Sequence, residues 1–140
     1  MQQELLLSKN FLQVEKLSDS TILVGKWIGF TPSQNFRQGV EWIFRYMKDN
    51  NIDKVLMDST EQKVVQQVDR EYAFGLFKTM KESLNQNVYQ AMLQPKDIFN
   101  STAVQDYIRF ANGNLGYEAV QVFDNKQKAI DWLNTKSYQF

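Results

Sequence analysis

Short apolar runs alternate with helical stripes along this chain, and this alternation restricts its fold more than any other feature. Val55-Leu56-Met57 is typical of a strand covered on both faces, and Val88 to Leu93 and Ala119 to Phe123 are the predicted strands that follow. A segment with helical periodicity lies between each run and the next. A strand, a helix and a second strand in this order form a right-handed crossover with parallel strands. The sequence therefore predicts an α/β sheet whose later strands are parallel.

The segment before the first helix predicts a hairpin. Phe11 to Leu17 alternates between two faces, and Thr21 to Trp27 places Ile22 and Val24 on the same face. Ser18-Asp19-Ser20 between them has turn chemistry. We expect these two strands to pair antiparallel.

Four helices are expected. Thr31 is the predicted N-cap of the first, with Pro32 at its first helical position, and Asn50-Asn51 ends it. Its apolar stripe is Phe36, Val40, Ile43, Phe44 and Met47. The second helix begins between Glu61 and Gln67 and ends at Asn85-Gln86-Asn87. Its stripe is Val65, Val68, Tyr72, Leu76, Phe77, Met80 and Leu84, with Phe74 nearly opposite.

The last two helices are placed by their caps. Asn100-Ser101 is expected to cap the third helix, which buries Val104, Ile108 and Ala111 and ends at Gly113 and Gly116. Asp124-Asn125 caps the fourth, which buries Ala129, Ile130 and Leu133. The order is β-β-α-β-α-β-α-β-α, which predicts one domain over residues 1–140 with a mixed sheet of about five strands. We expect an ordered core over about residues 9–134, with loose ends at Met1 to Ser8 and Thr135 to Phe140.

Composition excludes several classes of function. The chain has no histidine and no cysteine, so it lacks a thiolate nucleophile, an imidazole base and the usual zinc ligands. Sixteen acidic residues balance sixteen basic ones, which argues against nucleic acid as a partner. No apolar run is long enough to span a membrane, and Glu4 does not suit a signal peptide. We expect a cytoplasmic protein that needs no cofactor and no metal.

Two short motifs resemble a known family. The first is Val122-Phe123-Asp124, followed after four residues by Ala129-Ile130-x-Trp132-Leu133, and the second is the central run Val55-Leu56-Met57-Asp58. Both are similar to motifs of the SpoIIAA-like branch of the STAS (sulphate transporter and anti-sigma factor antagonist) superfamily. The resemblance spans roughly residues 11–133 and implies a STAS-like fold with a regulatory role. Anti-sigma factor antagonists carry a phosphorylatable serine after the central strand, commonly in Asp-Ser-Ser-Gly. Ser59 matches that serine, whereas Thr60-Glu61 departs from the motif. Relatives also resemble lipid-carrying CRAL-TRIO domains in outline, which implies an apolar ligand as an alternative.

The carboxyl ends of the strands form the expected ligand-binding rim. The candidate ligand or regulatory residues there are Phe30, Asp58, Ser59, Thr60, Lys96 and Asp124. Phosphate on Ser59 would meet a helix N-terminus if one follows directly, although Asp58 and Glu61 would repel it. Asp58 and Ser59 are equally compatible with ordinary loop and cap roles. Two roles are open for Asp69. It is a candidate for a catalytic acid or base, or it is a residue of the first helical turn whose negative charge suits the helix dipole.

A second candidate surface lies on the first helix. Trp42 and Tyr46 lie four residues apart and off the apolar stripe, with Gly39 on the same flank. They indicate either a dimer surface or a wide buried face. Phe74 is a weaker indication of the same kind.

The sequence favours a non-catalytic binding or regulatory module that acts through a protein partner or through itself as a homodimer. A carrier of a small apolar or amphipathic ligand is the alternative. A hydrolase or isomerase that uses Asp58 or Asp69 is a more remote one. A deep cavity would favour the carrier, an exposed aromatic patch the interaction module, and two close carboxylates in a cleft the enzyme.

Overall fold

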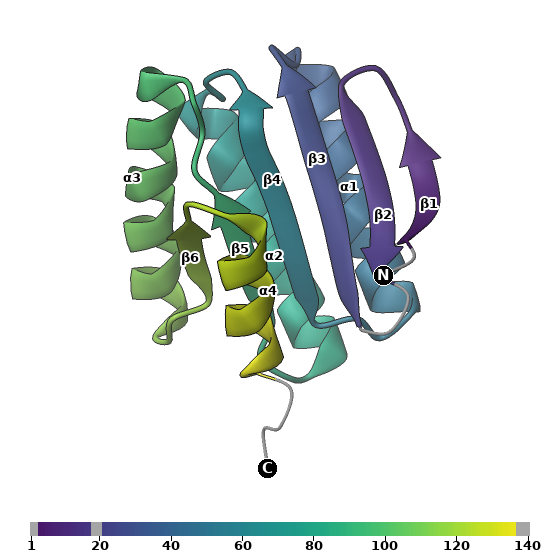
Figure 1. Ribbon diagram of the computed structural model, residues 1–140. Coiled ribbons are helices and arrows are strands. Elements are labelled where there is room, and N and C mark those ends of the chain that lie inside the picture. Colours follow the sequence, from purple (N-terminus) through teal and green to yellow (C-terminus); the bar gives the residue numbers. More distant parts are fainter. Residues whose placement is uncertain (1–2, 18–20, 137–140) are drawn as a thin grey trace.

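The structure is a computed structural model and describes residues 3–17 and 21–136. It is a single six-stranded sheet with helices on both faces (Figure 1). The strands are β1 (Gln3–Ser8), β2 (Leu12–Leu17), β3 (Ile22–Gly29), β4 (Lys54–Gln62), β5 (Tyr89–Leu93) and β6 (Val120–Phe123). The helices are α1 (Ser33–Asp49), α2 (Gln67–Leu84), α3 (Ile98–Leu115) and α4 (Lys126–Asn134).

The strands follow one another across the sheet in chain order. β1, β2 and β3 pair antiparallel, and β3 to β6 are mutually parallel. The predicted antiparallel hairpin and the predicted parallel later strands are therefore confirmed. The expected turn at residues 18–20 lies outside the described residues.

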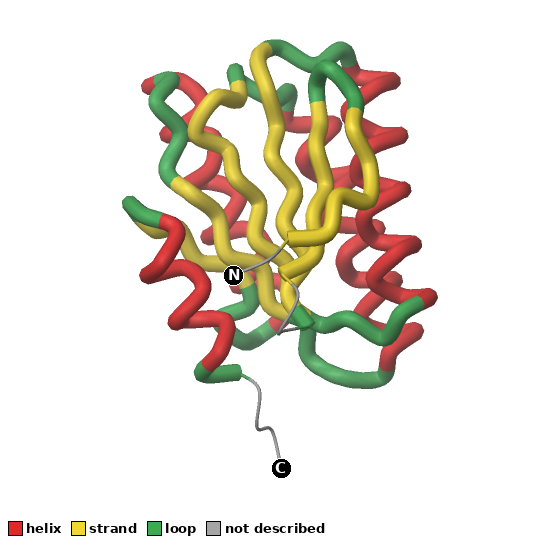
Figure 2. Tube along the Cα trace, turned by 45° about the vertical axis from the view of Figure 1, so that its right-hand side comes forward, coloured by secondary structure: helices red, strands yellow, loops and turns green. Residues whose placement is uncertain are grey.

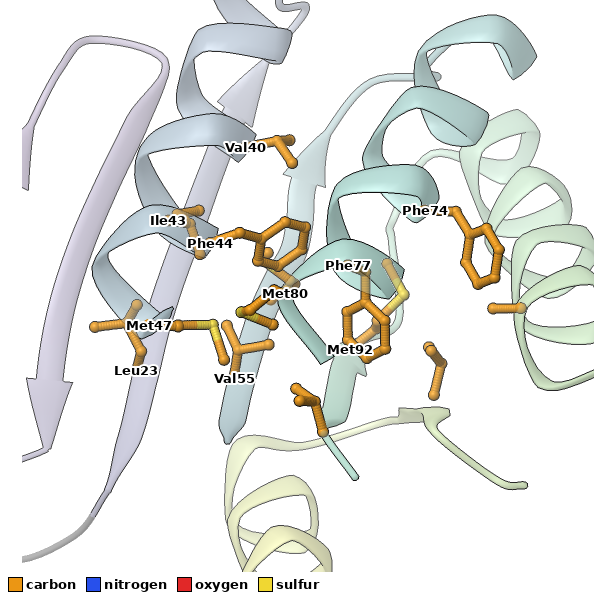
Figure 3. Close-up of a cluster of buried hydrophobic side chains, with 14 of the residues drawn as sticks. Leu23, Val40, Ile43, Phe44, Met47, Val55, Phe74, Phe77, Met80 and Met92 are labelled. Carbon is orange, nitrogen blue, oxygen red and sulfur yellow. The ribbon is translucent and has the colours of Figure 1, made fainter. Parts of the chain in front are cut away.

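The helices divide unequally between the two faces (Figure 2). α1, α2 and α3 cover one face and share the larger core cluster, in which Phe44 of α1 meets Phe77 of α2 edge-on at 5.8 Å between ring centroids (Figure 3). α4 alone packs on the other face, where Ala129, Ile130 and Leu133 are buried as predicted. The predicted stripe of α1 is also buried throughout.

The sheet has six strands rather than about five, because the segment expected to be a loose end forms β1. Leu5-Leu6-Leu7 gives a short apolar run, and β2 supplies the antiparallel partner that makes it a strand. Leu6 and Leu7 pack against the larger core cluster. Residues 3–8, which were expected to be a loose end, are thus part of the sheet.

The central strand is longer than predicted. β4 continues past Met57 to Gln62, so Asp58 and Ser59 lie inside the strand and not after it. Lys26 pairs with Asp58 and Ile28 with Glu61, which leaves one extra residue in β4 between the two pairs. Such a bulge bends the strand locally and changes the direction of the side chains beside it.

Two helix starts were predicted wrongly. Pro32, not Thr31, is the N-cap of α1, and no side chain caps it. Asp97, not Asn100, caps α3, with its carboxylate accepting from the N–H groups of Phe99 and Asn100 at 2.9 and 3.2 Å. Asp97 is the better cap because its carboxylate accepts both hydrogen bonds, whereas Asn100 is already inside the helix and buried.

The inward face of α2 also differs from the predicted stripe. Val68 is 57% exposed and Phe74 is only 7% exposed. Asp69 takes the inward position in the first turn of α2. Phe74 is inward because α3 runs beside α2 and its Phe110 meets Phe74 edge-on at 5.0 Å.

The ends of the last two helices agree better with the sequence. α3 ends at Gly116, which adopts the left-handed conformation at φ 78°. Gly113 lies within α3, so it is not part of the exit. Asn125 caps α4 as predicted, accepting from the N–H of Lys128 at 2.9 Å.

Candidate functional site

A cavity of about 60 Å³ lies between the sheet and the helices of the larger core cluster. Its apolar wall comes from Trp27 on β3 and from three side chains of α1, namely Phe36, Val40 and Phe44. Met57 on β4 and Met92 on β5 form the floor, where the two residues are paired in register. The apolar part of the cavity lining is therefore formed by three strands and one helix.

Polar side chains from three elements also line this cavity. Ser59 and Gln62 come from β4, Gln90 from β5 and Asn100 from α3, and all four are at most 5% exposed. The Asn100 amide donates to the backbone carbonyl of Gln62 at 3.1 Å and to its side-chain oxygen at 3.4 Å. Ser59 Oγ and Gln90 Oε1, by contrast, are buried and find no hydrogen-bond partner among the described residues. Two unsatisfied oxygens thus lie in one cavity.

Arg70 and Tyr107 separate the cavity from a surface hollow of about 170 Å³. The Arg70 guanidinium donates to the Val65 carbonyl. Burial raises the pKa of Tyr107 well above its ordinary value, so its phenol stays uncharged. Arg70 is the one permanent charge among the residues that line the cavity. The site is therefore suited to a ligand that combines an uncharged polar group with an apolar surface.

The predicted rim residues reach the same end of the molecule, but the sheet separates them. Ser59 faces the cavity on the side of α1, α2 and α3. Asp58 lines a groove on the α4 side together with Lys26 and Lys126. Successive residues of a strand point to opposite faces. Asp58 and Ser59 therefore cannot act together on one ligand.

The other predicted rim residues make local contacts. Thr60 donates to the Asp58 carboxylate from its hydroxyl at 2.6 Å and from its backbone N–H at 3.1 Å. Lys96 pairs with Glu61 at 2.8 Å, and this hydrogen bond and charge lower the pKa of Glu61. Asp124 is 3.1 Å from Lys128 at the start of α4. Phe30 is exposed after β3.

Ser59 does not have the surroundings on which the phosphate hypothesis was based. It is 1% exposed inside β4, and α2 begins only at Gln67. No helix N-terminus follows it directly, because β4 continues to Gln62. The placement of Ser59 in front of a helix was wrong.

Exposed apolar side chains gather at the carboxyl-end rim. We call this set of residues the rim patch: Phe30, Val64, Val68, Ile98 and Phe99. Each of them is between 46% and 75% exposed. These residues follow β3, β4 and β5, which are parallel and point in the same direction, with β3 and β4 ending at the top of the sheet in Figure 1. Backbone hydrogen bonds join the loop after β4 to the end of β3, from Lys63 to Gly29 at 3.1 Å, and the loop after β5 to β4, from Lys96 to Thr60 at 3.2 Å.

Asp69 has a structural role in the contact between α1 and α2. It is 3% exposed and accepts from Ser33 Oγ at 2.7 Å and from Arg37 Nε at 2.9 Å. Arg37 also lies over the Tyr72 ring at 4.4 Å, and Tyr72 donates to Glu41. These contacts hold the two helices side by side along the cavity wall. The Asp69 carboxylate therefore already accepts hydrogen bonds from Ser33 and Arg37.

Trp42 and Tyr46 stack on each other at 5.3 Å and are half-buried against the larger core cluster. Gly39 lies under Leu12 and Trp27 of the sheet, since an added Cβ would be 2.8 Å from each. The close approach at Gly39 is thus made by the chain's own sheet. The dimer surface predicted at Trp42 and Tyr46 stays a prediction.

Among residues 3–17 and 21–136, acidic side chains do not gather in threes as a metal site would require. The expectation that no metal is needed stays a prediction. None of the helices described combines the length and the apolar character needed to cross a bilayer.

Gln62, Gln90, Asn100 and Tyr107 were not predicted as site residues. Gln90 interrupts an otherwise apolar strand, and that interruption was a usable signal. Asn100 was interpreted as a helix cap, an interpretation that its amide chemistry also fits. Only the packing of α3 on β4 brings Asn100 to the cavity.

The fold is a SpoIIAA-like α/β fold. An uncharacterised protein of the DUF3478 family from Shewanella loihica PV-4, with a SpoIIAA-like fold, is 18% identical, with a TM-score of 0.58 over 95% of this chain and 96% of that one. A candidate anti-sigma factor antagonist from Thermotoga maritima is 9% identical, with a TM-score of 0.60 over 89% of this chain and 96% of that one. No family model matches the sequence, and no curated protein resembles it.

Proposed function

We propose that this chain is a non-catalytic regulatory module that binds a protein partner through the rim patch. The observation that carries the proposal is the pair Ile98 and Phe99, which stand 74% and 75% exposed in the first turn of α3. Phe30 and Val64 extend this apolar surface onto the neighbouring loops. Contiguous exposed apolar groups are typical of interaction sites, because water solvates them poorly.

Charged pairs surround these apolar groups. Lys96 pairs with Glu61, and Lys63 Nζ lies 3.7 Å from the Asp97 carboxylate. An apolar centre with a polar border is the usual composition of a protein interface. The likeness to a candidate anti-sigma factor antagonist supports a regulatory role.

The carboxylates support a role without catalysis. Asp58 lines the α4 side of the sheet, whereas Asp69 lies between α1 and α2 on the other side. Each already accepts two hydrogen bonds from its neighbours. An acid–base pair for hydrolysis or isomerisation would need both groups in one cleft. The cytoplasmic location expected from the sequence stays a prediction.

The test compares partner binding by wild-type protein and by Ile98→Ser/Phe99→Ser. A protein cross-linked to the wild type in its own host is purified and titrated by calorimetry. We expect the double variant to bind at least tenfold more weakly, because interface centres dominate affinity. Both substituted side chains are exposed, so the fold should be unaffected.

Leu5→Ser is the matched control, since Leu5 is 59% exposed on β1 at the far edge of the sheet. It should bind the partner as the wild type does. Equal affinity of the wild type and the Ile98→Ser/Phe99→Ser variant would refute a role for the rim patch.

A further inference from the structure

We propose that the cavity between the sheet and α1, α2 and α3 binds a small uncharged amphipathic molecule, which has a short apolar chain and a hydroxyl or amide group. The site is distinct from the rim patch, and its occupant is a small molecule rather than a protein. The proposal is based on two unpartnered oxygens, Ser59 Oγ and Gln90 Oε1, in a cavity that is otherwise mostly apolar.

The two oxygens need a hydrogen-bond partner. A buried polar group without a partner opposes folding, so native cavities of this kind hold a ligand or ordered water. Ser59 is 1% exposed and Gln90 is 4% exposed, which makes bulk water a poor partner for either. Both residues are on central strands, where the backbone holds them in place.

The strand register shows how the polar and apolar groups alternate along the cavity. Gln90 is level with Val55, and Met92 is level with Met57. Ser59 lies two residues beyond Met57 on the same strand. The Met57–Met92 pair therefore lies between the two unpartnered oxygens. An apolar chain on the methionines would carry its polar group to Ser59 at one end or to Gln90 at the other.

The side chains around the two unpartnered oxygens carry no charge. Ser59, Gln62, Gln90 and Asn100 are neutral, and the phenol of Tyr107 is uncharged as well. A carboxylate or ammonium group would lose its hydration without gaining a counter-charge among them. Arg70 keeps its charge although it donates to the Val65 carbonyl, but it lies at the wall facing the surface hollow, which neither Ser59 nor Gln90 lines.

The size of the cavity limits the ligand to a few carbons. A dry cavity of about 150 Å³ in another protein accepts benzene. The cavity here is about 60 Å³, less than half of that volume, so a chain of about two or three carbons would fill it. A longer chain would extend past Arg70 and Tyr107 toward the surface hollow.

The test uses linear primary amides from acetamide to octanamide as probes. Trp27 lines the cavity, so its fluorescence reports binding once Trp42 and Trp132 are replaced by Phe. We expect affinity to rise roughly three- to fourfold per added CH₂ until the cavity is full, and then to level off. Hexanoate and hexylammonium should bind at least tenfold more weakly than hexanamide.

Two sets of variants locate the site. Ser59→Ala/Gln90→Leu removes both unpartnered oxygens and should weaken hexanamide binding at least fivefold. Ala73→Leu fills the cavity from α2 and should abolish binding, because Ala73 lines the cavity and is only half-buried. Thr79→Leu, at an exposed position on the same helix, and Ser83→Ala are the matched controls and should bind as the wild type does.

Three results would overturn the proposal. The first is that no amide binds saturably to the folded wild type. The second is that the wild type and the Ser59→Ala/Gln90→Leu variant bind hexanamide with equal affinity. The third is that the wild type binds hexanamide and the two ionic probes with equal affinity. The first would mean that the cavity holds water only. Circular dichroism of each variant establishes that a loss of binding is not a loss of folding.

Discussion

Ser59 and Asn100 illustrate how two buried polar residues in one cavity can differ in their contribution to stability. Asn100 donates to the Gln62 carbonyl at 3.1 Å, whereas Ser59 Oγ has no partner. A hydrogen bond contributes to stability only when it is made, and an unpaired buried group opposes folding. Burial by itself therefore does not tell which of the two side chains stabilises the fold.

We predict that Ser59→Ala leaves the free energy of unfolding unchanged or slightly higher. Asn100→Ala should lower it by about 1–3 kcal/mol, because the Gln62 carbonyl loses its donor. Urea denaturation of the two variants checks this difference. A loss on Ser59→Ala as large as on Asn100→Ala would show that the serine hydroxyl is bonded in solution.

Gly39 and Gly75 form a second pair of residues that only packing distinguishes. Both lie within helices, but a Cβ on Gly39 would be 2.8 Å from Leu12 Cδ2 and from Trp27 Cη2. A Cβ on Gly75 would meet nothing within 4 Å. Gly39 is thus required for α1 to approach the sheet, and Gly75 is not required for packing.

Gly39→Ala should destabilise the protein by about 1–3 kcal/mol, because the sheet and α1 cannot separate without opening the core. Gly75→Ala should stabilise it by roughly 0.5–1 kcal/mol through helix propensity alone. Thermal unfolding of both variants gives the comparison. Two changes of the same sign would contradict the packing at Gly39.

At the scale of elements, Tyr117 connects two strands that are far apart in sequence. It lies between α3 and β6, donates to the Val88 carbonyl at 2.8 Å and accepts from the Val88 N–H at 3.1 Å. These two bonds hold the segment before β5 beside the segment before β6. Burial raises the pKa of Tyr117 from 10.0 to about 12.

The raised pKa of Tyr117 predicts a loss of stability at high pH. Below pH 10 the phenol is protonated in both the folded and the unfolded chain, so its contribution is complete. Between pH 10 and 12 the unfolded chain ionises first, and the free energy of unfolding should fall. Tyr117→Phe should be less stable at pH 8 and should lose less over this range. Denaturation curves at pH 8, 10, 11 and 12 measure both effects.

Tyr72 and Tyr107 also have raised pKa values, so Tyr117→Phe should reduce the fall in stability and not remove it. An unchanged fall in the variant would mean that Tyr117 titrates alike in the folded and unfolded chain.

At the scale of the whole molecule, the open question is whether the chain pairs with a second copy. Trp42 and Tyr46 are half-buried and stack on each other, which leaves part of both rings accessible at the surface of α1. A self-complementary patch of this kind is a common basis of symmetric dimers.

For the dimer hypothesis we expect Trp42→Ser/Tyr46→Ser to be a folded monomer, whereas the wild type sediments as a dimer. Analytical ultracentrifugation over a range of concentrations measures both. The hypothesis fails if the wild type is monomeric throughout. It also fails if the double variant unfolds, because the two rings would then be part of the core.

The sequence alone determined the class of fold, because that class depends on local periodicities. The buried stripe of α1, the parallel β4, β5 and β6, and the caps at Asn125 and Gly116 all follow from residues close together in the chain. β1 could not be predicted as a strand, since an edge strand depends on the partner that it finds.

The tertiary structure alone decided the composition of the candidate site. The cavity joins Trp27, Ser59, Gln90 and Asn100, which come from four elements and meet only when the helices pack on the sheet. The burial of Phe74 likewise depends on Phe110 of α3. Sequence periodicity identifies the face that an element buries, but which side chains meet across that face is fixed by contacts between residues that are distant in the chain.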